Sequence, residues 1–262
     1  MIITILLGLL AGGVPSLLIF FWFKKTLNDK TDLYKKNCDS MLNAGLLAIF
    51  PVILMSGTVS VILNLSGVKS SQPLLYAALH TFLVFALSEE LAKYFMFRSR
   101  LNKIKGEHSW MDLIIYSTIV GIGFGLLESI VFALDSNPLV MLIRGISIPH
   151  GGYAAIVGYF YGMSINKNSK GYAALGVFIA FLIHGLYDFS LSEELSAFSD
   201  AAAVVALTLA LLDVIIIIVL IVFIRKHKND PKYTEPIAGT PRIVLDQAES
   251  DDLKELSDKD VL

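Results

Sequence analysis

Eight ionisable side chains interrupt the long apolar stretches in the middle of this sequence. They are Glu89, Glu90, Lys93, Glu128, Arg144, His150, His184 and Asp188. An ionisable group inside a membrane span costs roughly 2.5–3.5 kcal/mol on insertion scales, so such groups are candidates for function. If the stretches cross a membrane, these side chains must face one another or a wet cavity rather than lipid.

Helical spacing indicates which of these side chains can pair. Lys93 lies four residues after Glu89 and three after Glu90, so it can reach either carboxylate. The two glutamates themselves diverge by ~100° around the helix axis, which predicts different roles. Asp188 lies four residues after His184 and can orient its imidazole. In the same way, Phe124 lies one turn before Glu128 on the same face. Arg144 is interpreted as a packing cation, satisfied by Glu128 or by carbonyls at a helix end.

Carboxylates and imidazoles in an apolar pocket suit the activation of water. A desolvated glutamate can act as a general base, and a nearby histidine can donate to a developing oxyanion or to a leaving amine. No serine or cysteine is obviously placed beside a histidine. The alternative is a zinc site with three protein ligands, His150, His184 and Glu128, and a water. Because no His-Glu-x-x-His motif occurs, a centre without a metal or other cofactor is the favoured expectation.

The composition predicts that membrane helices position these residues. Of 262 residues, 55% are hydrophobic and 17% are charged, whereas soluble domains carry about 25% charged residues. A helix needs about 20 apolar residues to cross a bilayer. Seven ranges qualify, namely 2–23, 44–65, 74–97, 111–134, 139–163, 172–191 and 201–224. Lipid leaves no partner for unpaired backbone groups, so we expect an all-α, polytopic transmembrane bundle of about seven spans.

The positions of lysine and arginine predict the orientation of this bundle. With seven spans, every basic segment falls on one side: 24–36, 98–105, 167–170 and 225–228. Because basic loops stay in the cytoplasm, we expect the N-terminus outside and the C-terminus cytoplasmic. By helical rise, Glu89 would then differ in depth from Glu128 and His184 by roughly 8 Å.

Two segments outside the spans carry further expectations. Residues 225–262 contain Pro231, Pro236 and Pro241 and become acidic, which is typical of a disordered cytoplasmic tail. The chain is thus divided into a transmembrane domain at 1–224, with its motifs in 74–191, and a tail at 225–262. The single cysteine, Cys38, is placed in a polar loop.

Four short motifs, in order, carry a resemblance to a known family. They are Glu-Glu-x-x-Lys at Glu89–Lys93, Phe-x-x-x-Glu at Phe124–Glu128, Arg-x5-His at Arg144–His150 and His-x-x-x-Asp at His184–Asp188. Each lies inside a predicted span, and together they resemble the PrsW family of intramembrane proteases, within the superfamily of CAAX-processing proteases. The residue after Glu128 is often asparagine in that family, whereas Ser129 stands here.

The resemblance implies an intramembrane endopeptidase that cleaves a membrane-anchored protein, such as a regulatory or anti-sigma-like factor. It implies that Glu89 and Glu90 are the catalytic pair, that Glu128, His150 and His184 complete the centre, and that Asp188 orients His184. The expected location is the cell membrane, with the lipid bilayer and a protein substrate as partners and no nucleic acid. A proton-coupled transporter using the same side chains is the alternative. His80 is interpreted as a packed residue, and Asp213 is left outside the site.

Overall fold

The described part of the chain consists of helices. The computed structural model describes residues 10, 13–26, 32–135 and 149–240. Within these ranges there is no β-strand, and Ser109 and Pro236 form an isolated antiparallel bridge. The helices are α2 (Val14–Thr26), α3 (Asp32–Leu47), α4 (Ile49–Leu65), α5 (Val68–Ser71), α6 (Pro73–Leu79), the π-helix η2 (His80–Ala86), α7 (Leu87–Leu101), α8 (Trp110–Asp135), α10 (Pro149–Asn166), α11 (Lys170–Ser190), α12 (Glu193–Phe198), α13 (Ala201–His227) and α14 (Pro231–Thr234). The predicted helical fold is confirmed for these residues.

Five helical segments of the described chain are long and apolar enough to cross a membrane. They are Asp32–Leu65, Pro73–Leu101, Trp110–Ser129, Lys170–Ser190 and Ala201–His227. These segments overlap five of the predicted spans, 44–65, 74–97, 111–134, 172–191 and 201–224. The other two predicted spans overlap α2 and α10 but extend into residues 2–9 and 139–148, which lie outside the described residues. The total of seven spans therefore stays a prediction.

α8 lies at the centre of the bundle and packs against α3 on one side and α10 on another. The approach of α3 to α8 is close because glycines meet there. A Cβ atom added to Gly123 would collide with the carbonyl oxygen of Leu42 and lie 3.1 Å from the Cα of Gly45. Small residues allow helices in membranes to approach this closely. We call α3, α8 and α10 the packed half of the molecule.

Helix α3 corrects the prediction for Cys38, which is buried in this helix rather than in a polar loop. The buried residues of α3 recur at helical spacing, from Tyr34 through Cys38 to Met41. The ring of Tyr34 stacks on Tyr116 of α8 with centroids 5.8 Å apart. The segment was missed because its outward face is polar, so hydropathy alone did not indicate a helix.

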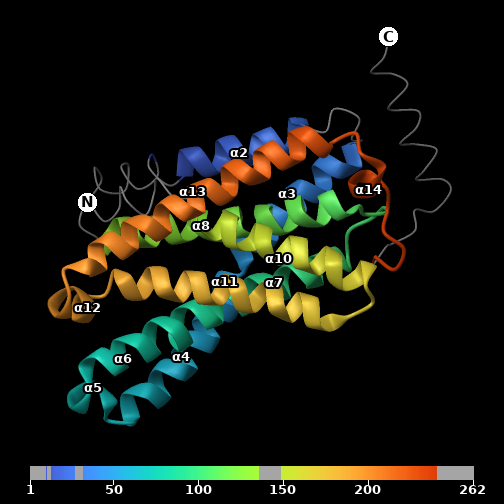
Figure 1. The fold of residues 1–262 in the computed structure, drawn as a ribbon. Helices are drawn as coiled ribbons and strands as arrows, with labels where there is room; N and C mark the ends of the chain where they lie inside the picture. Colours follow the sequence, from blue (N-terminus) through green and yellow to red (C-terminus); the bar gives the residue numbers. More distant parts are fainter. Residues whose placement is uncertain (1–9, 11–12, 27–31, 136–148, 241–262) are drawn as a thin grey trace.

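A hairpin of α4, α5 and α6 projects from the rest of the bundle (Figure 1). Many outward side chains of α4 are apolar, and Leu54 and Leu65 are 73% and 83% exposed. An apolar surface of this kind suits contact with lipid chains. We call residues 49–79 the hairpin. It continues through η2 into α7, so it leads directly to Glu89 and Glu90.

Part of the segment predicted to be a tail is packed against the bundle. Helix α13 extends to His227, and Tyr233 of α14 contacts Phe223 with ring centroids 5.0 Å apart. The backbone N–H of Ile237 donates to the carbonyl of His108 at 3.1 Å. The folded part of the chain thus continues beyond the predicted boundary at 225, to Thr240, while 241–262 lie outside the described residues.

Most basic residues outside the apolar segments gather at one end of the bundle, whereas Lys69 lies in α5 of the hairpin. The end of α2, the connection from α7 to α8, the connection from α10 to α11 and the end of α13 all lie at this basic end (Figure 1). Arg225 of α13 lies over the ring of Trp22 of α2 at 5.6 Å, which joins two of these segments. The orientation of this end toward the cytoplasm stays a prediction from the basic residues.

Candidate active site

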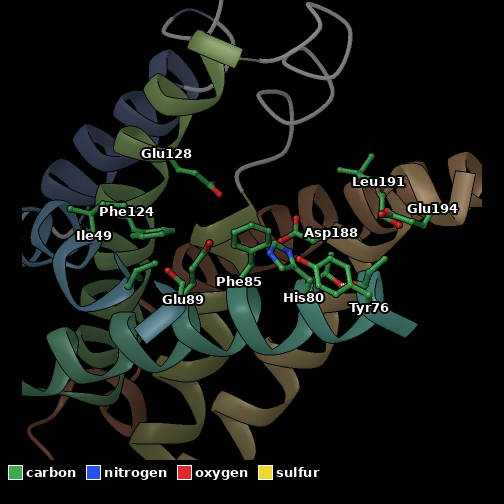
Figure 2. A pocket seen from close by; sticks show the side chains of 15 residues that line it. Ile49, Tyr76, His80, Phe85, Glu89, Phe124, Glu128, Asp188, Leu191 and Glu194 are labelled. Atoms are coloured by element: carbon green, nitrogen blue, oxygen red, sulfur yellow. Dashed lines mark hydrogen bonds between the residues drawn. The ribbon is translucent and has the colours of Figure 1, made fainter. Parts of the chain in front are cut away.

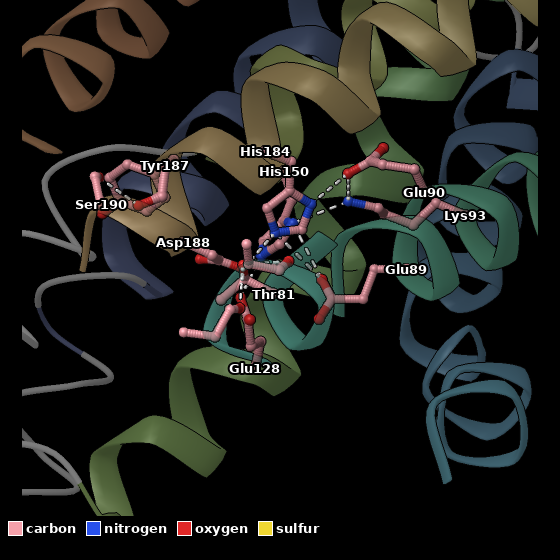
Figure 3. Close-up of polar contacts among 12 residues, drawn as sticks. Thr81, Glu89, Glu90, Lys93, Glu128, His150, His184, Tyr187, Asp188 and Ser190 are labelled. Atoms are coloured by element: carbon pink, nitrogen blue, oxygen red, sulfur yellow. Dashed lines mark hydrogen bonds and ion pairs between the residues drawn. The ribbon is translucent and has the colours of Figure 1, made fainter. Parts of the chain in front are cut away.

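Four helices bring the predicted polar side chains together in the membrane-spanning region (Figure 3). Helix α7 supplies Glu89, Glu90 and Lys93, α8 supplies Glu128, α10 supplies His150, and α11 supplies His184 and Asp188. Apart from Glu128 and Asp188, these residues are buried. Arg144, the remaining predicted member, lies outside the described residues.

The depth difference predicted between the glutamates is bridged by the two histidines. Counted from the basic end of each helix at about 1.5 Å per residue, the depths are ~18 Å for Glu89, ~21 Å for His184, ~24 Å for His150 and ~27 Å for Glu128. His184 lies next to Glu89, with Nε2 3.7 Å from Oε2, and His150 contacts Glu128. The two histidines therefore lie between Glu89 and Glu128.

Glu90 is held in a buried network of ion pairs. Lys93 Nζ donates to Glu90 Oε1 at 2.6 Å, and His184 Nδ1 donates to the same oxygen at 2.8 Å. The other nitrogen of His184, Nε2, lies 3.2 Å from Asp188 Oδ2. Glu90 and Asp188 thus fix the ring of His184 from both sides, as expected for Asp188 from the i,i+4 spacing.

Glu89 has different surroundings from its neighbour Glu90. Its Oε2 is buried and has no hydrogen-bond partner among the described residues. The nearest imidazole nitrogens are His184 Nε2 at 3.7 Å and His150 Nδ1 at 4.0 Å. A buried carboxylate oxygen without a hydrogen bond is costly, so this arrangement favours a bound cation or a reacting group at this position.

His150 is positioned in the first turn of α10 by close packing against α8. A Cβ atom added to Gly121 would collide with the carbonyl oxygen of His150, so only glycine allows this approach. The ring of Phe124 meets the ring of His150 edge-on with centroids 4.9 Å apart. Lys93 Nζ donates to His150 Nδ1 at 2.9 Å, and His150 Nε2 contacts Glu128 Oε2.

Glu89, His150 and His184 form a group that could hold a metal ion. One donor atom from each lies within 4.8 Å of the other two. Two imidazoles and one carboxylate are a frequent ligand set of catalytic zinc. In the zinc alternative predicted from the sequence the carboxylate was Glu128, whereas the group found in the structure contains Glu89. Glu128 instead contacts the outer nitrogen of His150.

A cavity of 420 Å³ opens beside this group (Figure 2). Glu89, Glu128 and Asp188 line it, whereas Glu90 and Lys93 do not. Most of the remaining lining comes from α4, α6 and η2, and both apolar and polar side chains contribute. The volume lies within the roughly 300–1,000 Å³ typical of ligand sites.

Three residues that the sequence analysis did not assign to the site adjoin it. His80 lines the cavity, although it was interpreted as a packed residue. Tyr153 stacks on His184 with centroids 5.2 Å apart, and its position one turn after His150 could have indicated this. Asp213 of α13 is buried against Gly152, where an added Cβ atom would collide with its Oδ1.

Comparison with known proteins agrees with the resemblance that the motifs carry. A family model described as "PrsW family intramembrane metalloprotease" matches residues 40–224. Protease PrsW of Clostridioides difficile is 27% identical over 191 residues, covering 69% of this chain and 77% of that protein. Protease PrsW of Oceanobacillus iheyensis is 22% identical over 193 residues, covering 71% of this chain and 84% of that protein. No solved structure matches the chain. Since the family model spans most of the sequence and all four helices of the site, this chain is an integral multi-pass membrane protein that belongs to the PrsW family of intramembrane metalloproteases.

Proposed function

We propose that this membrane protease hydrolyses a peptide bond of a membrane-anchored protein with a water molecule that a glutamate activates. The observation that carries the proposal is the convergence of Glu89, His150 and His184 beside a 420 Å³ cavity, which Glu89 lines. These residue types suit hydrolysis, and the cavity gives space for a segment of substrate beside them. A regulatory protein with a membrane anchor is the substrate class that the resemblance implies.

The donor set fits a metal ion, which the family description implies. Metal-bound histidines usually give their second ring nitrogen to a carboxylate, which orients the ring. Both histidines have this arrangement: His184 faces Glu90 through Nδ1, and His150 faces Glu128 through Nε2. Their other nitrogens lie toward the unbonded Oε2 of Glu89. We therefore assign Glu89, His150 and His184 as the residues that would hold zinc, which would supply Lewis acidity and favour the ionisation of water.

Glu128 is the carboxylate that we assign to proton transfer. It lines the cavity and lies on α8 beside His150, so it can accept a proton from an attacking water and give it to the leaving amine. This assignment differs from the pair Glu89 and Glu90 that the resemblance implies. Oε1 of Glu90 already accepts from both Lys93 and His184, and Glu90 does not line the cavity.

The remaining polar residues hold the reacting groups in place. Glu90 orients His184 through Nδ1, and Lys93 balances the charge of Glu90. Asp188 lies 3.2 Å from Nε2 of His184, the nitrogen that would hold zinc, so its carboxylate would add negative charge beside the ion. Lys93 Nζ also contacts His150 Nδ1. A metal ion held at that nitrogen would take the place of this contact, and the ion pair between Lys93 and Glu90 would remain. A buried ion pair fixes the geometry of its partners when both charges are satisfied.

Cleavage of candidate membrane-anchored proteins in cells tests this function. The compared chains are wild type, Glu89→Gln and His184→Gln at matched expression, with Glu193→Gln as a control. Glu193 is an exposed residue of α12 that does not line the cavity. We expect the site variants to lose at least about a hundredfold in cleavage, because they remove ligands of an ion that contributes several kcal/mol of transition-state stabilisation, while the control cleaves like wild type. Equal cleavage by Glu89→Gln and wild type would overturn the proposal.

A further inference from the structure

Three aromatic rings from α6 and η2 form one wall of the cavity. Tyr76 stacks on His80 with centroids 5.4 Å apart, and His80 meets Phe85 edge-on at 4.7 Å. All three side chains line the cavity. The wall runs from the end with Glu89 and Glu128 toward the end with Leu191 and Glu194 (Figure 2). Nothing in the hydrolytic chemistry above uses these rings.

The π-helix η2 explains why His80 and Phe85 are neighbours. In an α-helix, residues five apart diverge by ~140° around the axis and face different directions. A π-helix closes its hydrogen bonds between residues five apart, which brings such a pair close together. Short π-helical turns occur frequently at functional sites. Here the turn directs both rings into one cavity.

The wall is fixed in position relative to the reacting groups. Phe82, on the other face of η2, packs against Phe181 of α11 with centroids 5.7 Å apart. A Cβ atom added to Gly185 would collide with the ring of Phe82, so η2 lies directly against the residue that follows His184. The distance between the aromatic wall and His184 is therefore set by packing rather than by a loop.

The lining of the cavity defines what it can accept. Ile49, Val52 and Phe124 add further apolar surface to the lining. The hydroxyl of Thr81 donates to the carbonyl of Ala77 at 2.9 Å, so it is satisfied within its own helix. No lysine or arginine of the described residues lines the cavity, whereas four carboxylates do, namely Glu89, Glu128, Asp188 and Glu194.

We propose that this wall forms a specificity subsite for a large apolar side chain, aliphatic or aromatic, of the substrate residue next to the bond that is cleaved. The inference rests on the proposed function and adds the substrate preference to it. Acidic side chains are excluded because the carboxylates that line the cavity would repel them. Small side chains leave the space unfilled, so they lose the favourable burial of apolar surface.

Substrate variants of one single-span protein test the subsite with the full chain in membranes. The residues flanking the cleavage position are changed in turn to Ala, Leu, Phe, Lys and Asp, and kcat/KM is measured for each. We expect Leu or Phe on one side of the bond to be favoured over Ala by about tenfold or more, in the range found for apolar pockets. A preference for Lys or Asp, or no preference on either side, would overturn the inference.

Variants of the protease then test whether the lining of the cavity causes this substrate preference. Ser56→Phe places a ring in the cavity from α4, and we expect it to lower the ratio of kcat/KM for Leu over Ala at least about fivefold. Leu54→Phe is the matched control, since Leu54 lies on the same helix, is 73% exposed and does not line the cavity. An unchanged ratio in Ser56→Phe contradicts the subsite.

A second variant keeps the test decisive if Ser56→Phe fails to fold. Phe85→Ala removes one ring of the wall, and we expect it to reduce the preference for Phe over Ala. Retention of the full preference in Phe85→Ala contradicts the subsite. If wild type cleaves none of the substrates, the proposed function fails and the subsite fails with it. If wild type cleaves all of them and the preference is insensitive to these variants, the subsite alone is wrong.

Discussion

The packed half and the hairpin differ in burial, and the proposed chemistry and the proposed substrate selection fall on opposite sides of this difference. In α8, Tyr116 and Phe124 are each 1% exposed, whereas Leu54 and Leu65 of the hairpin are 73% and 83% exposed. The packed half holds His150 and Glu128 by close packing of helices. The hairpin and η2 supply the apolar wall of the cavity. Tightly packed regions keep reacting groups in one geometry, while regions with fewer contacts open at lower free-energy cost.

The largest expected effect is on catalysis in the packed half. Glu128→Gln preserves the shape of the side chain but removes its capacity to accept a proton. We expect kcat to fall by at least about a hundredfold with little change in KM, because the lost interaction acts in the transition state. Steady-state kinetics with a cleaved substrate measures both constants. A rise in KM at unchanged kcat would instead assign Glu128 to substrate binding.

A pair of glycine variants tests the difference in packing directly. An added Cβ at Gly121 would collide with His150 and lie 2.7 Å from the Cβ of Ala154, whereas nothing lies within 4 Å of one added at Gly57 in α4. We expect Gly121→Ala to lower the free energy of unfolding by about 1–3 kcal/mol, as overpacking does. Gly57→Ala should instead raise it by about 0.4–1 kcal/mol. Thermal unfolding in the same detergent compares the two, and equal shifts would contradict the contrast.

Asp213 extends the packed half to α13, and a double-mutant cycle measures its coupling to α10. Gly152→Ala should destabilise the protein, because the new Cβ collides with the carboxylate of Asp213. Combining it with Asp213→Ala removes the collision, so the two effects should fail to add by about 0.5 kcal/mol or more. Thermal unfolding of wild type, the two single variants and the double variant gives this coupling free energy. Simple additivity would show that the contact has no energetic weight.

The smallest expected effect is at the surface. Lys24 of α2 pairs with Asp39 of α3 at 2.7 Å, and the Asp39 side chain is 52% exposed. Exposed ion pairs contribute about 0–1 kcal/mol, so Lys24→Met should change the free energy of unfolding by no more than this. Raising the salt concentration in the same assay should reduce the difference further. A loss comparable with that of Gly121→Ala would mean that α2 depends on this pair.

The sequence indicated the site residues because each of them carries an insertion cost inside an apolar stretch. It also indicated contacts within one helix, such as His184 with Asp188, since helical spacing alone determines them. Contacts between helices, such as His150 with Glu128, depend on how α8 and α10 approach each other and have no local signature. Helical spacing predicted different roles for Glu89 and Glu90. Which of the two faces the cavity depends on the neighbouring helix α11, so spacing alone could not predict it.

Two elements of the fold escaped prediction for physical reasons. Helix α3 buries one face and exposes a polar one, so its mean hydropathy is too low for a span, although its helical spacing is regular. The π-helical turn η2 has no distinctive composition, because its residues would suit an α-helix equally well. Its extra residue per turn places His80 beside Phe85, a contact that an α-helical projection does not give.

The most direct measurement is the zinc dependence of cleavage by the purified, reconstituted protein, in wild type and in Glu89→Gln. Wild type should lose cleavage after exhaustive chelation and recover it when zinc is returned, because Glu89, His150 and His184 would then hold the ion again. Glu89→Gln should stay at least about a hundredfold below wild type at the same zinc concentration. Full cleavage by wild type after chelation, or restoration of Glu89→Gln to the wild-type rate, would contradict the assignment of these three residues as the reacting centre.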